Sequence, residues 1–200
     1  MPVVVDFGSG VTFLPFVIGR RGFEVVCVDQ DPLYEQDIQR AAMRLQPAGD
    51  HVRFSLSRGN SLPLPDHSVN VVYSVSVLEH IPEHAAIVAE FARVLIPGGV
   101  LLLTIDINLE PYGGGIGPAK YASLLLNLHQ YFDFEYPRLP IHPAAVLTSA
   151  RGPYAVRRPS GVKAIWWVAK QKLIKPLIGR APAAHLACEG LMLRRRNGFL

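Results

Sequence analysis

The chain has 200 residues, of which half are hydrophobic, and it carries a formal net charge of +4 with two cysteines. This length is ample for one hydrophobic core and short for two, and the hydrophobic content excludes a largely disordered chain. The sequence has no uncharged apolar run of about 18 residues, so we expect no transmembrane helix; we also expect no signal peptide ahead of the first strand.

The N-terminal stretch Val3-Val4-Val5-Asp6-Phe7-Gly8-Ser9-Gly10 is the strongest single signal in the chain. Its β-branched run predicts a buried strand, and the glycines that follow predict a turn that lets backbone approach a ligand. A strand, a glycine turn and a helix form the entrance to a nucleotide-type site in an open α/β sheet. Because Phe13 stands where a dinucleotide fingerprint needs a third glycine, a ligand without a pyrophosphate fits better, and S-adenosylmethionine is such a ligand.

A second buried strand, Glu24-Val25-Val26-Cys27-Val28-Asp29, ends in another acid. Asp29 follows Gly10 by 19 residues, close to the spacing expected of a carboxylate that accepts both ribose hydroxyls. Asp31 is the weaker candidate for this role, because Asp31-Pro32 is typical of a helix start.

Four motifs follow in order: GNSLPLPD at 59–66, VNVVYS at 69–74, VLEHI at 77–81 and VLIPGG at 94–99. With them the chain resembles the class I S-adenosylmethionine-dependent methyltransferases over about residues 3–107. The resemblance implies an α/β fold: a Rossmann-like, doubly wound sheet of seven strands, mostly parallel, with an antiparallel C-terminal edge pair.

The resemblance also implies roles for individual residues around the cofactor. Asn60 departs from the usual Asp, although its amide oxygen can still accept a hydrogen bond from the adenine amino group. The implied roles are a loop around the methionine moiety for Asp6, Gly8, Ser9 and Gly10, a ribose contact for Asp29, an adenine border for Asn60 and Ser61, and the methionine end for Ser74.

We expect a single methyltransferase domain over residues 1–200. Its parts are a cofactor-binding core at about 1–110, an acceptor or lid region at about 111–185 and a final strand at about 185–194. Family members usually have a segment ahead of the glycine-loop strand, and this segment often closes over the cofactor. We therefore expect either that the start codon has been assigned too late or that the C-terminal half supplies the lid. The expected strands are 3–6, 24–29, 52–56, 69–74, 100–105, 131–136 and 185–193, and the expected helices are 13–21, 33–46, 84–95 and 118–130.

Methyl transfer from a sulfonium requires an aligned nucleophile and, in some cases, the removal of a proton. The acceptor should lie beyond the carboxyl ends of strands four and five, where His80 and Asp106 are the candidate catalytic residues. In such motifs His80 and its neighbour Glu79 more often serve loop packing and cofactor support, and Tyr112, His129 and His142 are weaker candidates. No metal-ligand cluster is apparent, so we expect no metal.

The proline-rich and basic stretch from Pro137 to Ala184 includes a helix expected at about 162–178, with two tryptophans beside lysines. Such a helix either covers the active site or a sheet edge with its lysines in water, or lies on a membrane surface as a peripheral contact. Nucleic-acid binding is disfavoured, because the aromatic residues do not alternate with basic ones. The oligomeric state is left open.

We therefore expect methyl transfer to an O or N of a small molecule, sugar or lipid-linked acceptor. A non-catalytic S-adenosylmethionine-binding protein and a nicotinamide-dependent oxidoreductase are the alternatives. Cys27 and Cys188 lie in apolar, strand-like sequence and are expected to be buried free thiols of a cytoplasmic protein.

Overall fold

The computed structural model describes residues 1–108, 115–136, 160–170, 173 and 186–198. Tyr112, His142 and most of the expected acceptor or lid region lie outside these ranges. The strands are β1 (Val3–Phe7), β2 (Glu24–Asp29), β3 (Val52–Leu56), β4 (Val69–Val75), β5 (Leu95–Asn108), β6 (Phe132–Phe134) and β7 (Leu186–Arg195). The helices are α1 (Leu14–Gly19), α2 (Leu33–Arg44), η1 (Ala48–His51), η2 (Leu78–His80), α3 (His84–Val94), α4 (Pro118–Tyr131) and α5 (Val162–Ala169).

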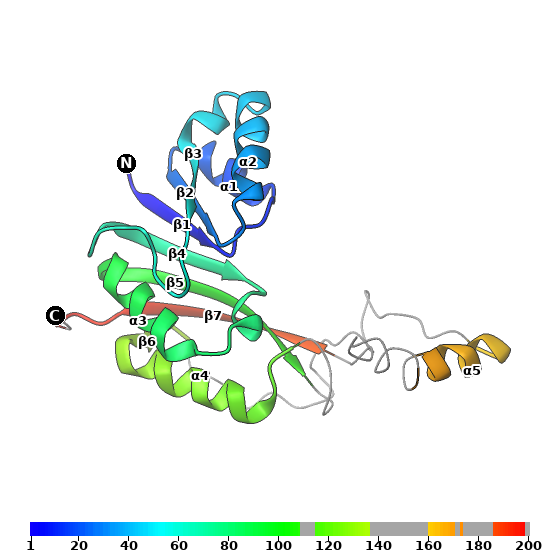
Figure 1. Ribbon diagram of the computed structural model, residues 1–200. Helices are drawn as coiled ribbons and strands as arrows, with labels where there is room; N and C mark the ends of the chain where they lie inside the picture. The colour runs from blue at the N-terminus through cyan, green and yellow to red at the C-terminus, as the bar shows by residue number, and fades with distance from the viewer. Residues whose placement is uncertain (109–114, 137–159, 171–172, 174–185, 199–200) are drawn as a thin grey trace.

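All seven strands form one sheet in the order β3-β2-β1-β4-β5-β7-β6 (Figure 1). The first five strands of that order are parallel, while β7 runs antiparallel to both β5 and β6. The expected fold class is therefore confirmed, including the antiparallel edge pair. In the register Asp6 lies beside Cys27 of β2 and Tyr73 of β4, so the carboxyl ends of β1, β2 and β4 meet at one edge of the sheet.

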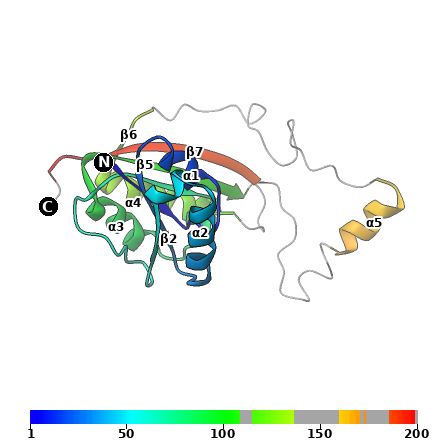
Figure 2. The same ribbon diagram turned by 90° about the horizontal axis from the view of Figure 1, so that it is seen from above.

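Helices cover both faces of this sheet, which therefore has a hydrophobic core on each face (Figure 2). Successive side chains of β2 point alternately into the two cores. Val26 and Val28 belong to the larger core, which includes residues of α3 and α4, whereas Val25 and Cys27 pack with residues of α1 and α2. Phe91 of α3 meets Phe7 edge to face, with ring centroids 5.1 Å apart. Hydrophobic burial on both faces thus fixes the strand end that leads into the glycine bend.

Several element ends differ from the sequence-based expectation. β5 begins at Leu95 rather than 100, because Leu95 pairs with Val69 before an irregularity leads to the pair Val71–Val100. The last predicted strand also extends further, to Arg195, while β6 shortens to three residues. The expectation of two buried thiols was wrong, because Cys27 is buried and Cys188 is exposed.

Alternation along β7 explains the exposed thiol. Ala187, Leu191 and Leu193 are buried, and Cys188 has the opposite parity, so its side chain leaves the sheet on the other face. None of the helices in the described ranges has both the length and the apolar character needed to cross a bilayer.

Candidate functional site

The glycine bend between β1 and α1 has a backbone conformation that favours glycine. Gly8 and Gly10 have φ values of 71° and 49°, in the left-handed region. The Gly8 N–H donates to the Val28 carbonyl at 2.8 Å, and a Cβ added at Gly8 would come within 2.4 Å of Val77 Cγ2. A Cβ at Gly10 would meet nothing within 4 Å, so the backbone at Gly10 is open to a ligand.

Asp29, at the end of β2, is bonded to this bend. Its Oδ2 accepts the Gly10 N–H at 2.9 Å, and its Oδ1 accepts the N–H groups of Gln30 at 2.7 Å and Asp31 at 3.3 Å. A carboxylate offers about four acceptor positions, so these three bonds leave little unused capacity. Asp29 therefore holds the bend in place as well as being the predicted ribose acceptor.

Asp6 and Ser9 lie beneath the bend with their side chains buried. Burial, reinforced by the negative charge of Asp29, raises the pKa of Asp6 to about 6. The nearby Tyr73 hydroxyl lowers this pKa in part, although it makes no hydrogen bond of regular geometry in the described part of the chain. The bend thus presents its backbone, rather than these two side chains, to its open side.

Ser74 joins the ends of two neighbouring strands, because its hydroxyl donates to the Phe7 carbonyl at 3.0 Å. Ser76, just beyond β4, has a φ of 53°, which is uncommon for a residue other than glycine. Its N–H donates to the carbonyl of Thr104 at 3.0 Å and lies 3.1 Å from the Thr104 hydroxyl oxygen. The turn after β4 is therefore tied to β5.

The loop after β3 carries Asn60 and Ser61 and lies beside the loop after β2. Gln30 Nε2 donates to the Gly59 carbonyl at 3.4 Å, which links the two loops. Asn60 is half-buried, whereas the Ser61 hydroxyl is directed at Glu90 of α3, 3.5 Å away. The structure thus brings Asn60 and Ser61 to the same edge as Asp29, but Ser61 also has a partner outside the predicted adenine border.

Glu79, which the sequence assigned to loop packing and cofactor support, is a buried acid after β4. Its side chain is only 7% exposed, and both carboxylate oxygens lack a hydrogen-bond partner among the described residues. Burial raises the pKa of this carboxyl group, and the charge of Asp106 raises it further. The backbone N–H groups of Glu79 itself and of Asp106, together with the charge of His80, oppose the rise. An acid inside the apolar run Val77-Leu78-Glu79-His80-Ile81 was the sequence signal for this buried carboxyl group.

The two predicted catalytic residues flank Glu79 but differ in exposure. His80 is exposed, while Asp106 is half-buried in β5 and lies opposite Cys188 of β7. Glu79, Asp106 and His80 interact electrostatically at the carboxyl end of β4 and β5. The structure therefore places acid and base groups where an acceptor is expected in a parallel sheet.

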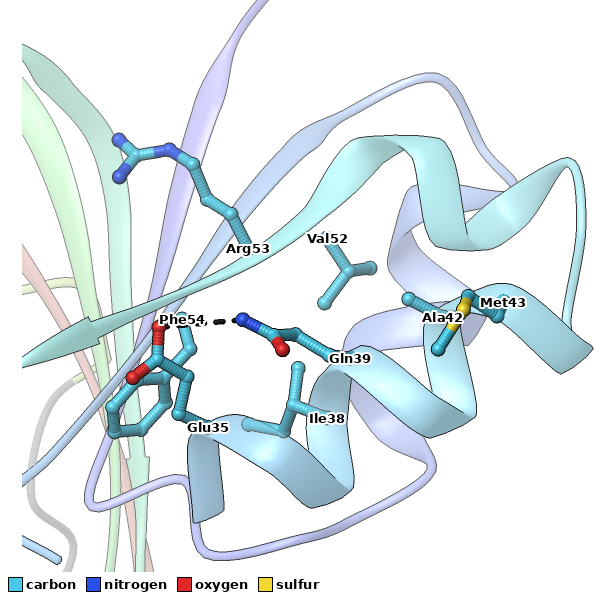
Figure 3. A pocket seen from close by; sticks show the side chains of 8 residues that line it. All are labelled: Glu35, Ile38, Gln39, Ala42, Met43, Val52, Arg53 and Phe54. Atoms are coloured by element: carbon cyan, nitrogen blue, oxygen red, sulfur yellow. Dashed lines mark hydrogen bonds between the residues drawn. The ribbon is translucent and has the colours of Figure 1, made fainter. Parts of the chain in front are cut away.

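A separate hollow of about 430 Å³ lies between α2 and β3 (Figure 3). Its apolar part includes Ile38, Val52 and Phe54, and at its rim Gln39 donates to Glu35 at 3.3 Å. Arg53 extends away from the hollow. None of the predicted site residues lines it.

Comparison with known proteins decides the family. Residues 5–103 match the family described as "Methyltransferase domain". An uncharacterized methyltransferase of Mycobacterium sp. (strain JLS) is 39% identical over 111 residues, which are 56% of this chain and 41% of that relative. Residues 5–103 therefore form a methyltransferase domain, in line with the resemblance to the class I S-adenosylmethionine-dependent methyltransferases. The chain spans about two fifths of the length of such relatives.

Solved structures share the methyltransferase fold at low sequence identity. The [4+2]-cyclase SpnF has a TM-score of 0.67 and 19% identity, covering 98% of this chain and 75% of SpnF. A second structure is geranyl diphosphate C-methyltransferase from Streptomyces coelicolor A3(2), in complex with Mg²⁺, geranyl diphosphate and S-adenosylhomocysteine. It has a TM-score of 0.66 and 13% identity, and the match covers 98% of this chain and 74% of that enzyme. Since one of these two proteins is a cyclase, the fold alone does not fix the reaction.

S-adenosylmethionine is the cofactor of this methyltransferase family, and the bend fits it in two respects. A Cβ added at Gly10 would meet no atom within 4 Å, so that side of the bend is open, and the Asp29 carboxylate is already oriented beside it by backbone N–H groups. Both are groups that a ligand with a ribose and an amino-acid end can contact.

Proposed function

We propose that this chain transfers the methyl group of S-adenosylmethionine to an O or N atom of a small molecule, a sugar or a lipid-linked acceptor. The observation that carries the proposal is the bond between the Gly10 N–H and Asp29 Oδ2, 2.9 Å long, which joins the glycine bend to the strand-end acid. In a nucleotide site on an open α/β sheet, the bend and this acid contact opposite ends of one ligand.

In this proposal the bend at Gly8 to Gly10 surrounds the methionine moiety, with Asp6 and Ser9 supporting it from below and Ser74 closing the end nearest β4. Asp29 accepts from the ribose, and Asn60 and Ser61 border the adenine. When bound, the cofactor supplies an electrophilic methyl carbon. The protein's task is then to align a nucleophile with that carbon and to exclude water.

The proposed acceptor lies beyond the ends of β4 and β5, next to Glu79, His80 and Asp106. A hydroxyl acceptor must lose a proton as its bond to the methyl carbon forms, and an ammonium acceptor must lose one beforehand to free its lone pair. Asp106, half-buried, or the exposed His80 would accept that proton, and the raised pKa of buried Glu79 suits it to hold one. The acceptor region at about 111–185 would complete this pocket.

Calorimetric titration with S-adenosylmethionine tests the cofactor site. We expect Asp29→Ala to weaken binding by about 1.5–3 kcal/mol, the range for a hydrogen bond that involves a charged group. Asp31→Ala is the matched control, because the Asp31 side chain accepts only the Leu33 N–H among the described bonds, and the change should leave affinity within about twofold. A thermal melt of each variant separates lost binding from lost folding.

Equal affinity of Asp29→Ala and the parent chain would refute the ribose assignment. Binding of NAD in preference to S-adenosylmethionine would refute the cofactor site altogether. For catalysis, fractions of cell extract are screened for acceptance of a labelled methyl group. Firm cofactor binding without S-adenosylhomocysteine release in any fraction would leave the non-catalytic alternative standing.

A further inference from the structure

Helix α5 is apolar and yet buries no side chain in the described structure. Both figures show it apart from the sheet (Figures 1 and 2). Val162, Ile165 and Trp166 are 83%, 72% and 66% exposed, and Leu173 beyond the helix is 63% exposed. Val162, Ile165 and Trp166 stand at i, i+3 and i+4, with Ala169 at i+7, which places them on one face of α5. A helix with such a face needs a partner.

Lysines border this apolar face on one side. At about 100° per residue, Lys163 and Lys170 project close to one another, next to Trp166. The Lys170 ammonium lies 6.0 Å from the centre of the Trp166 ring, and both lysines are exposed. Trp167 projects beyond the lysines and is half-buried, so the two tryptophans occupy different environments.

The surrounding sequence has an extreme charge bias. Between Pro137 and Ala184 there are nine Lys and Arg residues and no Asp or Glu, whereas the rest of the chain has 11 Lys and Arg against 16 Asp and Glu. The positive charge of the whole chain therefore resides in this segment. A partner that complements α5 is negatively charged and also offers an apolar layer.

We propose that α5 docks on an anionic lipid surface, with Val162, Ile165 and Trp166 in the boundary between headgroups and acyl chains and Lys163 and Lys170 on lipid phosphates. An amphipathic helix with lysines next to a tryptophan-containing apolar face binds membranes in this orientation. A nucleic acid would satisfy the lysines, but it offers no layer for the aliphatic side chains of this face. The proposal does not depend on the methyl acceptor.

The chain contains a built-in probe of this contact. Its two tryptophans, Trp166 and Trp167, both lie in α5, so the intrinsic tryptophan fluorescence of the full chain reports on this helix alone. We expect a blue shift when vesicles of phosphatidylcholine with about 30% phosphatidylserine are added, and a much smaller shift with phosphatidylcholine alone. Acyl chains brominated near the headgroup should quench the emission.

Two matched single-tryptophan variants localise the contact. Trp167→Phe should keep the shift and the quenching, because Trp166 remains on the apolar face, whereas Trp166→Phe should lose most of both. Lys163→Gln with Lys170→Gln should lower the vesicle partition coefficient about 30-fold, since each lysine near an anionic surface contributes about 1 kcal/mol. Cofactor affinity, measured by calorimetry, should be unchanged in all of these variants.

Three outcomes would overturn the proposal: no shift with any vesicle, equal quenching of the two single-tryptophan variants, or undiminished partitioning of the double lysine variant. A blue shift produced by a single-stranded oligonucleotide without lipid would instead assign the surface to nucleic acid. If cofactor binding fails while the vesicle contact persists, the proposed function fails alone.

Discussion

Asp6 is a carboxylate held out of water at the base of the glycine bend, and its protonation should affect stability. Its pKa in the folded chain is about 6, against an ordinary value of 3.8. The folded state therefore binds a proton more tightly than the unfolded state. Stability falls as the pH rises from about 4 to about 6, and the full cost of the buried charge is present above pH 6.

Asp6→Asn removes that charge with little change of shape. We expect its free energy of unfolding to exceed that of the parent chain by about 1–3 kcal/mol at pH 7.5, with the difference vanishing near pH 4. Urea unfolding at the two pH values measures this. Asp37→Asn, at an exposed residue paired with Arg40, is the control and should show no such pH dependence. An equal gain at both pH values would mean that the change acts through packing instead.

The sequence could locate the residues of the cofactor edge but not their bonding. The spacing from Gly10 to Asp29 predicted a ribose-binding acid at the end of β2, and the structure places that acid beside the glycine bend, 2.9 Å from the Gly10 nitrogen. The spacing did not indicate that Asp29 already accepts three backbone N–H groups. Nor could it show that Glu79 is buried and makes no side-chain hydrogen bond to the described residues, because burial depends on helices and strands that are distant in the sequence.

At the scale of elements, Arg93 of α3 fixes the loop between β3 and β4. It donates to the carbonyls of Leu62 and Leu64, both at 2.9 Å, to Asp66 at 2.6 Å and to both oxygens of Glu90. Glu90 in turn accepts the Leu62 N–H at 2.8 Å. The arginine that precedes the Pro-Gly-Gly motif thus positions the loop that carries Asn60 and Ser61.

Replacing Arg93 by lysine keeps the charge but not the planar fork that makes these bonds. We expect Arg93→Lys to lower the free energy of unfolding by about 1–2 kcal/mol and Arg93→Met by about 2–4 kcal/mol, because Met leaves Glu90 and two carbonyls without their donor. Cofactor affinity should fall in the same order if the loop borders the adenine. Chemical denaturation and calorimetry on the same samples provide both values.

A second Arg-to-Lys change serves as the control, because it distinguishes the loss of the loop's hydrogen bonds from the effect of replacing any exposed arginine. Arg40→Lys alters an exposed helix pair and should be neutral within about 0.5 kcal/mol. If Arg93→Lys matched Arg40→Lys in both stability and affinity, the loop would be held by its apolar contacts and Arg93 would be dispensable.

Elements with one strong periodicity were predictable. A helix was expected at 84–95, where Ile87, Val88 and Phe91 recur at helical spacing, and all three are fully buried. The start of β5 was not predictable, because Pro97-Gly98-Gly99 signals a turn, whereas in the sheet it follows an early pair between Leu95 and Val69. Pairing with a neighbour overrode the local turn signal there.

At the scale of the whole molecule, the matched family region is not a complete sheet. Residues 5–103 end within β5, whose other neighbour is β7, paired with it from Val100–Arg194 to Asn108–Leu186. Leu191 and Leu193 of β7 belong to the main core. The chain therefore closes its sheet with a strand that follows the basic segment, and that segment is a long insertion between β6 and β7.

This arrangement predicts that the insertion can be removed without loss of the fold. β6 and β7 are already paired at Phe134–Leu193, and from there to the start of β7 is about 24 Å at 3.4 Å per residue. A Gly/Ser linker of about 12 residues in place of 137–184 spans that length. This linker is about a quarter as long as the segment it replaces, so closing it costs less chain entropy. The free energy of unfolding should therefore rise by about 1 kcal/mol.

The linker variant separates the proposed roles of the two parts of the chain. If β1 to β5 hold the cofactor, its affinity for S-adenosylmethionine should match that of the parent chain within about twofold. Vesicle binding should disappear, because the variant lacks α5 and all nine basic residues of the segment. Calorimetry and co-sedimentation measure these two properties. A folded variant that no longer binds the cofactor would place part of the cofactor site in the insertion and would refute the assignment of that site to residues 1–110.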